Sequence, residues 1–313
     1  MRGRVNVEGM KPFDIFAAEP GQGWVPWALI MPALALTFVI GPSLAVSLPL
    51  QDWGLLDAQE EPVGRLGFIA LLLLPFGAMG LFVVAWAYLI ERRPLDAIGL
   101  VDAGAGNTFS YGLLIGTLTS SGVVAAIWAA GGFQVAAIAP AFASADALIY
   151  IAVLLACFAV QSSAEEILFR GWMLSALTRR INVIGAIVIV SAIFTLLHFG
   201  RDKTLLTMVS TFLFSVFACC LALKARNIWS VMGWHAGWNW LLATGFESRV
   251  TGLDVQVPAL IARLIPVGPA DLTGGAEGPE GSVFCVLFFA GAIALLVVRG
   301  ALSPRPQRPP SPS

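Results

Sequence analysis

The sequence predicts an all-α membrane protein, a polytopic bundle of about eight transmembrane helices with one short interfacial helix. Of its 313 residues, 58% are hydrophobic and only 12% are charged, whereas a soluble domain carries roughly 25% charged residues. Mean hydropathy is +0.84, and several charge-free windows reach the ~20 residues that a spanning helix needs. The net charge is −1 and no basic stripe alternates with aromatic residues, so nucleic acid is not an expected partner.

The charge-free windows place the eight spans along the chain. The window 103–145 is too long for one span, and Gly131, Gly132 and Pro140 indicate that its second half is a loop. A short helix over 167–179 is expected to lie at the interface or to re-enter the membrane. The predicted spans are 25–48, 67–90, 109–130, 146–166, 182–200, 204–224, 228–246 and 282–299.

The distribution of Lys and Arg predicts the orientation of these spans. If the N-terminus is cytoplasmic, 13 of the 18 Lys and Arg residues fall in cytoplasmic segments, as the positive-inside rule requires. We therefore expect a multi-pass protein of the inner or plasma membrane with both termini in the cytoplasm.

The chain reads as one hydrophobic domain with polar ends. The segment 247–281 is rich in Gly and Pro and carries acidic residues, which favours a flexible outside loop. The end of the chain is low in complexity and rich in Pro, so we expect it to be disordered. The predicted divisions are a cytoplasmic N-terminal segment 1–24, helices one to three within 25–145, a core 146–246, the loop 247–281, a last helix 282–299 and the tail 300–313.

Three ionisable groups interrupt the apolar sequence at SSAEEILFRG, residues 162–171. A charged group at the bilayer centre costs about 2.5–3.5 kcal/mol on insertion scales. Glu166 and Arg170 are four residues apart in the favourable order, so they can pair on one helix face. Glu165 has Phe169 at its own i+4 position, so the helix offers it no partner. One carboxylate is thus expected to be held, and the other to be available.

The only two histidines lie in other predicted spans. His198 ends the fifth span, four residues after Phe194, and His235 lies in the seventh span, four residues before Asn239. Together with Glu165, the two imidazoles suit a zinc site with an open position for water, or an acid–base pair that activates water directly. The Asn239 amide is a donor of the kind that stabilises an oxyanion. Both alternatives lead to hydrolysis of an amide inside the membrane.

In this order and spacing, the three motifs resemble those of the CPBP family of CAAX proteases and bacteriocin-processing enzymes, also called the Abi or type II CAAX prenyl endopeptidase family. EEILFRG matches Glu-Glu-x-x-x-Arg, FTLLH matches Phe-x-x-x-His, and HAGWN matches His-x-x-x-Asn. ERRPLDAIGL, at 91–100, resembles the basic stretch that precedes the family's core, and RNIWSVMGWH resembles the segment that leads into its third motif. The motif region covers about 146–246, under a third of the chain.

The resemblance implies an intramembrane endopeptidase of eight helices. Glu165 would activate the attacking water with His198 beside it, and His235 and Asn239 would bind metal or stabilise the oxyanion. Glu166, Arg170 and Phe194 would support the site. If Zn²⁺ is the cofactor, its ligands would be Glu165, His198 and His235. Eukaryotic members cut prenylated CAAX tails but bacterial members lack that substrate class, so the expected substrate is only a membrane-associated protein or peptide; the oligomeric state is not predicted.

Two other classes of function fit parts of the pattern. Intramembrane Glu and His also build the proton relays of transporters, but the two halves of the chain show no internal repeat of the kind transporters carry. A non-catalytic scaffold of the same fold has no chemical reason to retain all four of the candidate catalytic side chains, Glu165, His198, His235 and Asn239.

Overall fold

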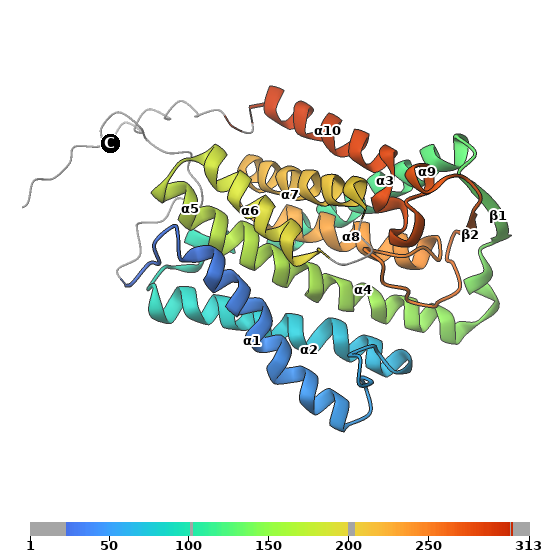
Figure 1. Cartoon of the computed structure of the whole chain (residues 1–313), viewed down its shortest axis with the longest axis horizontal. Helices are drawn as coiled ribbons and strands as arrows, with labels where there is room; N and C mark the ends of the chain where they lie inside the picture. Colours follow the sequence, from blue (N-terminus) through green and yellow to red (C-terminus); the bar gives the residue numbers. More distant parts are fainter. Residues whose placement is uncertain (1–22, 101–102, 200–203, 301, 303–313) are drawn as a thin grey trace, which may run out of the picture.

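The computed structural model describes residues 23–100, 103–199, 204–300 and 302, and most of them are helical (Figure 1). The predictions for the N-terminal segment and for the Pro-rich tail fall almost wholly outside these residues. The α-helices are α1 (Met31–Asp52), α2 (Gly64–Ala85), α3 (Ala105–Ala129), α4 (Ala145–Glu166), α5 (Leu174–Arg180), α6 (Val183–Leu197), α7 (Leu205–Ala225), α8 (Trp229–Gly245), α9 (Ala270–Thr273) and α10 (Val283–Val298). The strands are β1 (Phe133–Ile138) and β2 (Ala262–Pro266).

Five helices within the described ranges are long and apolar enough to cross a membrane. They are Met31–Asp52, Gly64–Ile90, Ala105–Ala129, Ala145–Arg180 and Leu205–Ala225. The other three predicted spans correspond to the shorter helices α6, α8 and α10, of 15, 17 and 16 residues. The fold is thus that of a helical membrane protein, but the number of eight spans is not confirmed.

The predicted interfacial helix 167–179 is not separate from the fourth span. A π-helix, η4 (Ile167–Met173), joins α4 directly to α5, so one helix of 36 residues runs over Ala145–Arg180. The charges at Glu165, Glu166 and Arg170 end the apolar window but not the helix, because their partners lie inside the protein. π-Helical turns occur frequently at functional sites.

Polar residues begin several helices in the way that capping rules predict. The side chains of Ser144, Asn182, Thr204 and Ser282 each accept a hydrogen bond from the backbone N–H three residues later. Asp146 lies in the first turn of α4 and pairs with Arg65.

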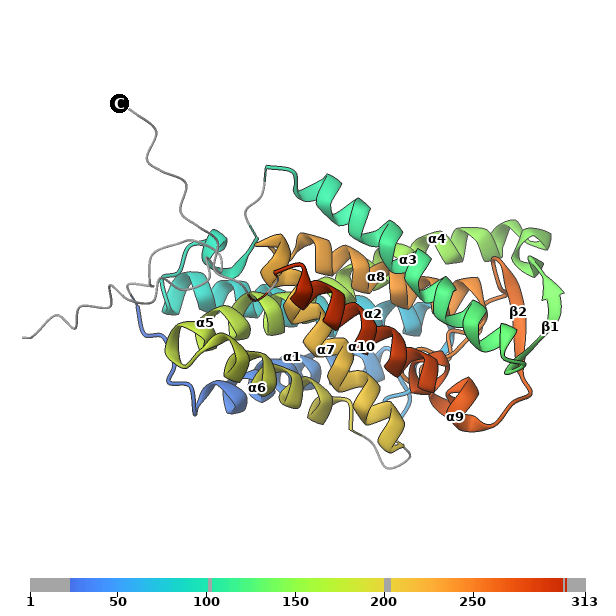
Figure 2. The ribbon, with the colours of Figure 1, turned by 90° about the horizontal axis from the view of Figure 1, so that it is seen from above.

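The long α4–α5 helix forms the middle of the bundle, with α1 and α2 on one side and α6, α7 and α10 on the other (Figure 1). Helix α8 packs against α4 and makes an extensive contact with α3, which lies beside it (Figure 2). Small residues permit this close approach: a Cβ on Gly112 or Gly116 would overlap the backbone of α8, and one on Gly233 or Gly237 would overlap that of α3. A Cβ on Gly122, also on α3, would meet open space.

Segment 247–281 is not the irregular loop that its composition predicts. It contains β2, α9 and two short 3₁₀-helices, and β2 pairs antiparallel with β1 at the end of the bundle opposite α5 (Figure 1). The pairing sets Phe133 opposite Pro266. The segment therefore closes one end of the helical core.

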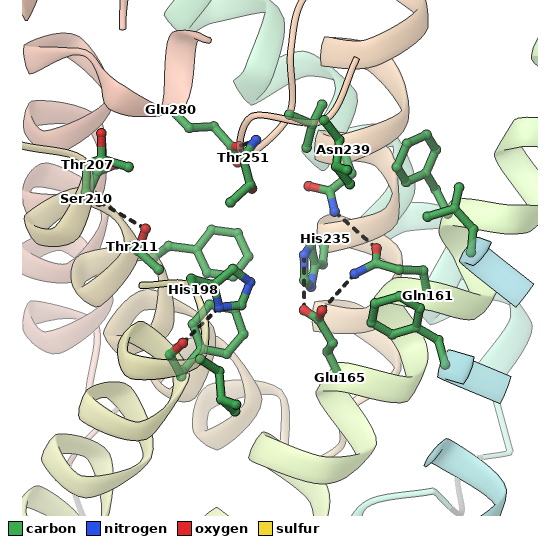
Figure 3. A pocket seen from close by; sticks show the side chains of 18 of the residues that line it. Gln161, Glu165, His198, Thr207, Ser210, Thr211, His235, Asn239, Thr251 and Glu280 are labelled. Carbon is green, nitrogen blue, oxygen red and sulfur yellow. Dashed lines mark hydrogen bonds and ion pairs between the residues drawn. The ribbon is translucent and has the colours of Figure 1, made fainter. Parts of the chain in front are cut away.

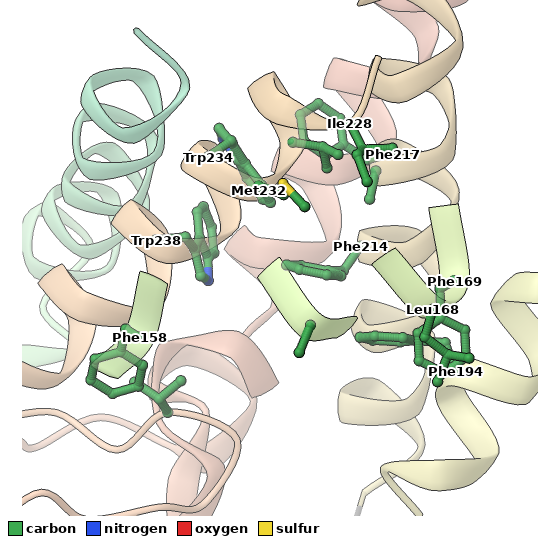
Figure 4. Packing of buried hydrophobic residues seen from close by; sticks show 14 of the residues in the cluster. Phe158, Leu168, Phe169, Phe194, Phe214, Phe217, Ile228, Met232, Trp234 and Trp238 are labelled. Carbon is green, nitrogen blue, oxygen red and sulfur yellow. The ribbon is translucent and has the colours of Figure 1, made fainter. Parts of the chain in front are cut away.

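Aromatic residues fill the core between α7, α8 and α10. Trp234 and Trp238 are fully buried and lie against Phe217 and Phe289, with ring centroids 4.6–6.0 Å apart (Figure 4). Their indole N–H groups donate to Thr119 and to the carboxylate of Glu280 respectively, since a buried indole needs an acceptor. This packing holds α8, and with it the second histidine, against its neighbours.

Candidate functional site

The ion pair predicted for the fourth span is present and completely buried. Arg170 donates to Oε1 of Glu166 at 3.1 Å, and neither side chain is exposed. The guanidinium also lies over the ring of Phe194, 4.7 Å from its centroid, which is a favourable cation–π position. Arg170 therefore links the first motif to the second through an ion pair on one side and an aromatic face on the other.

Glu166 has a second partner that its sequence position does not reveal. Nδ1 of His235 lies 2.8 Å from the same Oε1. An ionised carboxylate only accepts hydrogen bonds, so Nδ1 of His235 carries a proton and donates it in a hydrogen bond to Glu166. Nε2 points toward Oε2 of Glu165 at 3.9 Å. The imidazole thus stands between the two carboxylates of α4.

Glu165 is buried, 7% exposed, yet its two oxygens differ in their surroundings. Oε1 accepts a hydrogen bond of 2.8 Å from Nε2 of Gln161, one turn earlier on α4. Oε2 is buried and has no hydrogen-bond partner within the described ranges. The prediction that its own helix offers Glu165 no partner is wrong, because Gln161 lies four residues before it on α4 and supplies one.

Asn239 reaches the same carboxylate through Gln161. Nδ2 of Asn239 donates to Oε1 of Gln161 at 3.2 Å, and the hydroxyl of Ser162 donates to that oxygen at 3.1 Å. A continuous chain of side-chain hydrogen bonds therefore runs from α8 to Glu165 (Figure 3). Gln161 was not among the predicted site residues. Its position one turn before Glu165 is common in helices, and its contact with Asn239 depends on the packing of α8 against α4.

His198 lies across the cavity from Glu165 and His235 (Figure 3). Its Nδ1 contacts the backbone oxygen of Phe194 at 2.8 Å, and its ring stacks on the Phe194 ring with centroids 4.3 Å apart. A carbonyl oxygen is an acceptor, so this contact places the proton on Nδ1 and leaves Nε2 as an acceptor. Phe194 thus orients His198 and supports Arg170 at once.

A cavity of about 410 Å³ joins these groups. Glu165, His198, His235 and Asn239 all line it, so residues from α4, α6 and α8 converge on one space as the sequence predicts. Apolar side chains of α2 form another part of the wall: Leu71, Leu72 and Phe76. The volume is in the range of ligand-binding pockets, which are mostly apolar with a few placed polar groups.

A second polar wall of the cavity was not expected from the sequence. Thr207 and Thr211 of α7 line it, and so do Thr251 and Glu280 from the segment after α8 (Figure 3). Oε2 of Glu280 accepts hydrogen bonds of 2.7 and 2.9 Å from the backbone and hydroxyl of Thr251. The segment 247–281 therefore contributes to the candidate site.

The donor types at the site suit zinc, but their arrangement does not. Two imidazoles and a carboxylate are ordinary Zn²⁺ ligands. Within the described ranges, however, no three His, Cys, Asp or Glu side chains lie close enough together to hold one metal ion. The oxygen partners of Nδ1 of His235 and of His198 do not exclude a metal, because they leave Nε2 of each ring as the nitrogen that could bind one. Glu165, His198 and His235 do not form a three-ligand cluster in this arrangement.

The basic stretch ERRPL braces the π-helix that follows the two glutamates. The buried carboxylate of Glu91 accepts hydrogen bonds from the indoles of Trp172 and Trp86, at 2.7 and 3.0 Å, and from Arg93 at 3.2 Å. Arg93 also donates to the hydroxyl of Ser175. Burial lowers the pKa of Arg93, and the adjacent carboxylate opposes that shift. The site helix is thus anchored from a segment some 80 residues away.

One comparison with known proteins covers this region. The family model described as type II CAAX prenyl endopeptidase Rce1-like matches residues 144–241, which contain all three motifs. No curated protein matches the chain.

Proposed function

We propose that this protein hydrolyses a peptide bond of a membrane-associated protein or peptide by means of a water molecule activated at Glu165. The proposal starts from the match of residues 144–241 to the type II CAAX prenyl endopeptidase family. The observation that carries this proposal is the convergence of Glu165, His198, His235 and Asn239 on one largely apolar cavity. The family match gives no support to a transporter or to a non-catalytic scaffold.

Glu165 is the general base of the proposed reaction. Its Oε2 takes a proton from water, and the water oxygen attacks the carbonyl carbon of the substrate. The tetrahedral intermediate then collapses, the C–N bond breaks, and Glu165 returns the proton to the leaving nitrogen. The products are a carboxylic acid and an amine, and the carboxylate is regenerated. The burial of Oε2 without a partner supports this role, since a buried charged oxygen needs a donor.

The remaining groups orient water and stabilise charge. Nε2 of His198, on the opposite wall, accepts a hydrogen bond from the attacking water. Asn239 uses one N–H toward Gln161, and its other N–H stabilises the developing oxyanion. Such a donor typically contributes about 10²–10³ in kcat. His235, fixed by Glu166, sets its ring between the two carboxylates of α4 and forms the wall of the cavity beside Oε2 of Glu165.

The first substrate to test is a prenylated CAAX peptide, because the matched family carries that name. The apolar part of the cavity wall, from α2 and α4, supports a lipidated or hydrophobic segment as substrate. The inference concerns the chemical type of the substrate, a lipidated or hydrophobic peptide segment, and names no particular substrate protein.

The test uses a farnesylated CAAX peptide, with a fluorophore and a quencher on either side of the bond to be cut, in vesicles containing the purified protein. Glu165→Ala and His198→Ala should abolish cleavage while the thermal unfolding of each variant stays close to wild type. Glu60→Ala, in an exposed turn, is the matched control and should keep full activity. Full cleavage by Glu165→Ala rejects the mechanism, and a wild type that leaves the peptide intact rejects the substrate class.

Zinc remains a prediction with its own measurement. Elemental analysis of purified wild type should be compared with the His198→Ala and His235→Ala variants. Stoichiometric zinc that is lost in both variants supports a metal site assembled by a rearrangement of these side chains. Active wild type without zinc supports hydrolysis by the glutamate alone.

A further inference from the structure

We propose that Gln161 is a positioning residue of the active site, which assigns the two oxygens of Glu165 to different tasks and fixes the orientation of the Asn239 amide. This inference rests on the proposed function and adds to it a residue outside the three motifs. It starts from the hydrogen bond that Nε2 of Gln161 donates to Oε1 of Glu165 at 2.8 Å.

The environment of Glu165 makes this hydrogen bond consequential. Glu165 has no Lys or Arg partner within the described ranges, and Gln161 supplies the hydrogen bond that holds Oε1. A carboxylate turns about its terminal torsion with a broad preference. Anchoring Oε1 therefore directs Oε2 toward the space beside Nε2 of His235, where it lies 3.9 Å away. Oε2 is then the oxygen that receives the proton from water.

The other end of the Gln161 amide acts on Asn239. Oε1 of Gln161 accepts from Nδ2 of Asn239 at 3.2 Å and from the Ser162 hydroxyl at 3.1 Å. The carboxylate of Glu165 only accepts, so the atom of Gln161 that faces it is the amide nitrogen, and the atom that faces Asn239 is the oxygen. An amide oxygen needs a donor, so Asn239 presents its nitrogen to Gln161. One N–H of Asn239 is thereby held by Gln161, and the other is left for the oxyanion.

The burial of Gln161 distinguishes this arrangement from a surface contact. Gln161 is 8% exposed, lines the cavity, and lies on the α4 face that meets α8. Both ends of its amide have partners that are themselves buried, Glu165 on one side and Asn239 and Ser162 on the other. The amide is consequently a rigid spacer between the base and the oxyanion donor, which come from different helices.

The kinetic test replaces the amide while keeping its volume. In the farnesylated peptide assay, Gln161→Met and Gln161→Asn should each lower kcat about 10- to 100-fold with little change in KM, which is the effect of one lost hydrogen bond to a charged group. Met keeps the bulk without the donor, and Asn keeps the amide but is one methylene too short. Thr37→Val, on α1 and outside the cavity lining, is the control, because the Thr37 hydroxyl donates to the backbone oxygen of Ala33 on the same helix.

A packing role predicts a different result. If Gln161 serves only to fill space, the Gln161→Met variant has the wild-type kcat, and this outcome overturns the proposal. A double-mutant cycle adds a second criterion: the losses from Gln161→Met and Asn239→Ala should be less than multiplicative, since both break the same chain of hydrogen bonds. Fully independent effects also overturn it.

A spectroscopic measurement separates this inference from the proposed function. In infrared difference spectra, the carboxylate stretch that disappears in Glu165→Gln belongs to Glu165. That band should shift in Gln161→Met and stay in place in Thr37→Val, whether or not the peptide is cut. An unmoved band contradicts the inference alone, whereas activity retained by Glu165→Ala contradicts the proposed function alone.

Discussion

The imidazole of His235 is held on one side by a carboxylate that is itself held by a guanidinium. Glu166 Oε1 is shared by Arg170, at 3.1 Å, and by Nδ1 of His235, at 2.8 Å. Both Glu166 and Arg170 are fully buried. The charge of Glu166 therefore compensates the cation of α4 and fixes the tautomer of an imidazole on α8 at the same time.

This double role predicts a stability difference between two adjacent glutamates. Glu166→Gln leaves the Arg170 charge buried without a counter-charge, and breaking a buried pair in this way costs about 3–5 kcal/mol. We expect a clearly lower midpoint of thermal unfolding in detergent for Glu166→Gln. Glu165→Gln is the matched control and should unfold near wild type, because Glu165 pairs with no Lys or Arg among the described residues. Equal midpoints for the two variants would contradict the assignment.

The sequence predicts only the part of this network that lies on one helix. The Glu166–Arg170 pair follows from a spacing of four residues, and the lack of an i+4 partner for Glu165 follows from Phe169. The contact of His235 with Glu166 and the link through Gln161 depend on how α8 is rotated against α4. The His235–Glu166 and Asn239–Gln161 hydrogen bonds join two helices, so spacing within one helix does not predict them. The Gln161–Glu165 hydrogen bond, in contrast, is an i,i+4 contact within α4.

Helix α3 determines where α8, and hence His235 and Asn239, can lie. The two helices meet through glycines on both sides, so their backbones come closer than side chains would allow. Backbone contact of this kind leaves little freedom for α8 to slide or rotate. The site residues of α8 are thus positioned from the face opposite the cavity.

Adding one methyl group at this contact should displace α8. Gly116→Ala places a Cβ against the backbone oxygen of Trp234. Overpacking of a tight contact costs about 1–3 kcal/mol. We expect lower thermal stability together with reduced cleavage. Gly122→Ala, on the same helix, meets nothing within 4 Å and should be neutral in both assays. A neutral Gly116→Ala would show that the helices are not held this closely.

The continuous helix Ala145–Arg180 explains one error of the sequence prediction. Hydropathy ends the fourth span at Glu166 because Glu165, Glu166 and Arg170 lie within six residues of one another. A helix, however, needs only backbone hydrogen bonds and room for its side chains, and the polar groups find partners on α8 and beside Phe194. The π-turn at Ile167–Met173 accommodates Arg170 without a break. At a rise of ~1.5 Å per residue, 36 residues extend about 54 Å, beyond the ~30 Å apolar thickness of a bilayer.

At the scale of the whole molecule, the orientation in the membrane remains a prediction from the Lys and Arg distribution. It can be tested by cysteine labelling, because all four native cysteines are buried. Ala58→Cys and Asp96→Cys lie at exposed positions in loops expected on opposite sides. A membrane-impermeant maleimide should label Ala58→Cys in intact cells and Asp96→Cys only after permeabilisation. The reverse pattern would invert the predicted topology.

The composition of segment 247–281 misleads at this scale as well. Its Gly and Pro residues suggest an unstructured loop, yet strand β2, the short helices and Glu280 give it defined contacts with β1 and α8. The partner strand lies 124 or more residues earlier in the chain, and single-sequence patterns do not specify such distant pairing. The glycines instead serve tight turns, as at Gly274, whose φ is +87°.

The pairing of β1 with β2 has a mechanical consequence. All the proposed catalytic side chains lie in the stretch of chain between the two strands, and Phe133 faces Pro266 where that stretch is entered and left. Tension applied along the backbone from outside would act on both strands at the same end. It would break the pairing of the strands one residue pair at a time, starting at Phe133 and Pro266, before it acted on the helices between β1 and β2 in the chain.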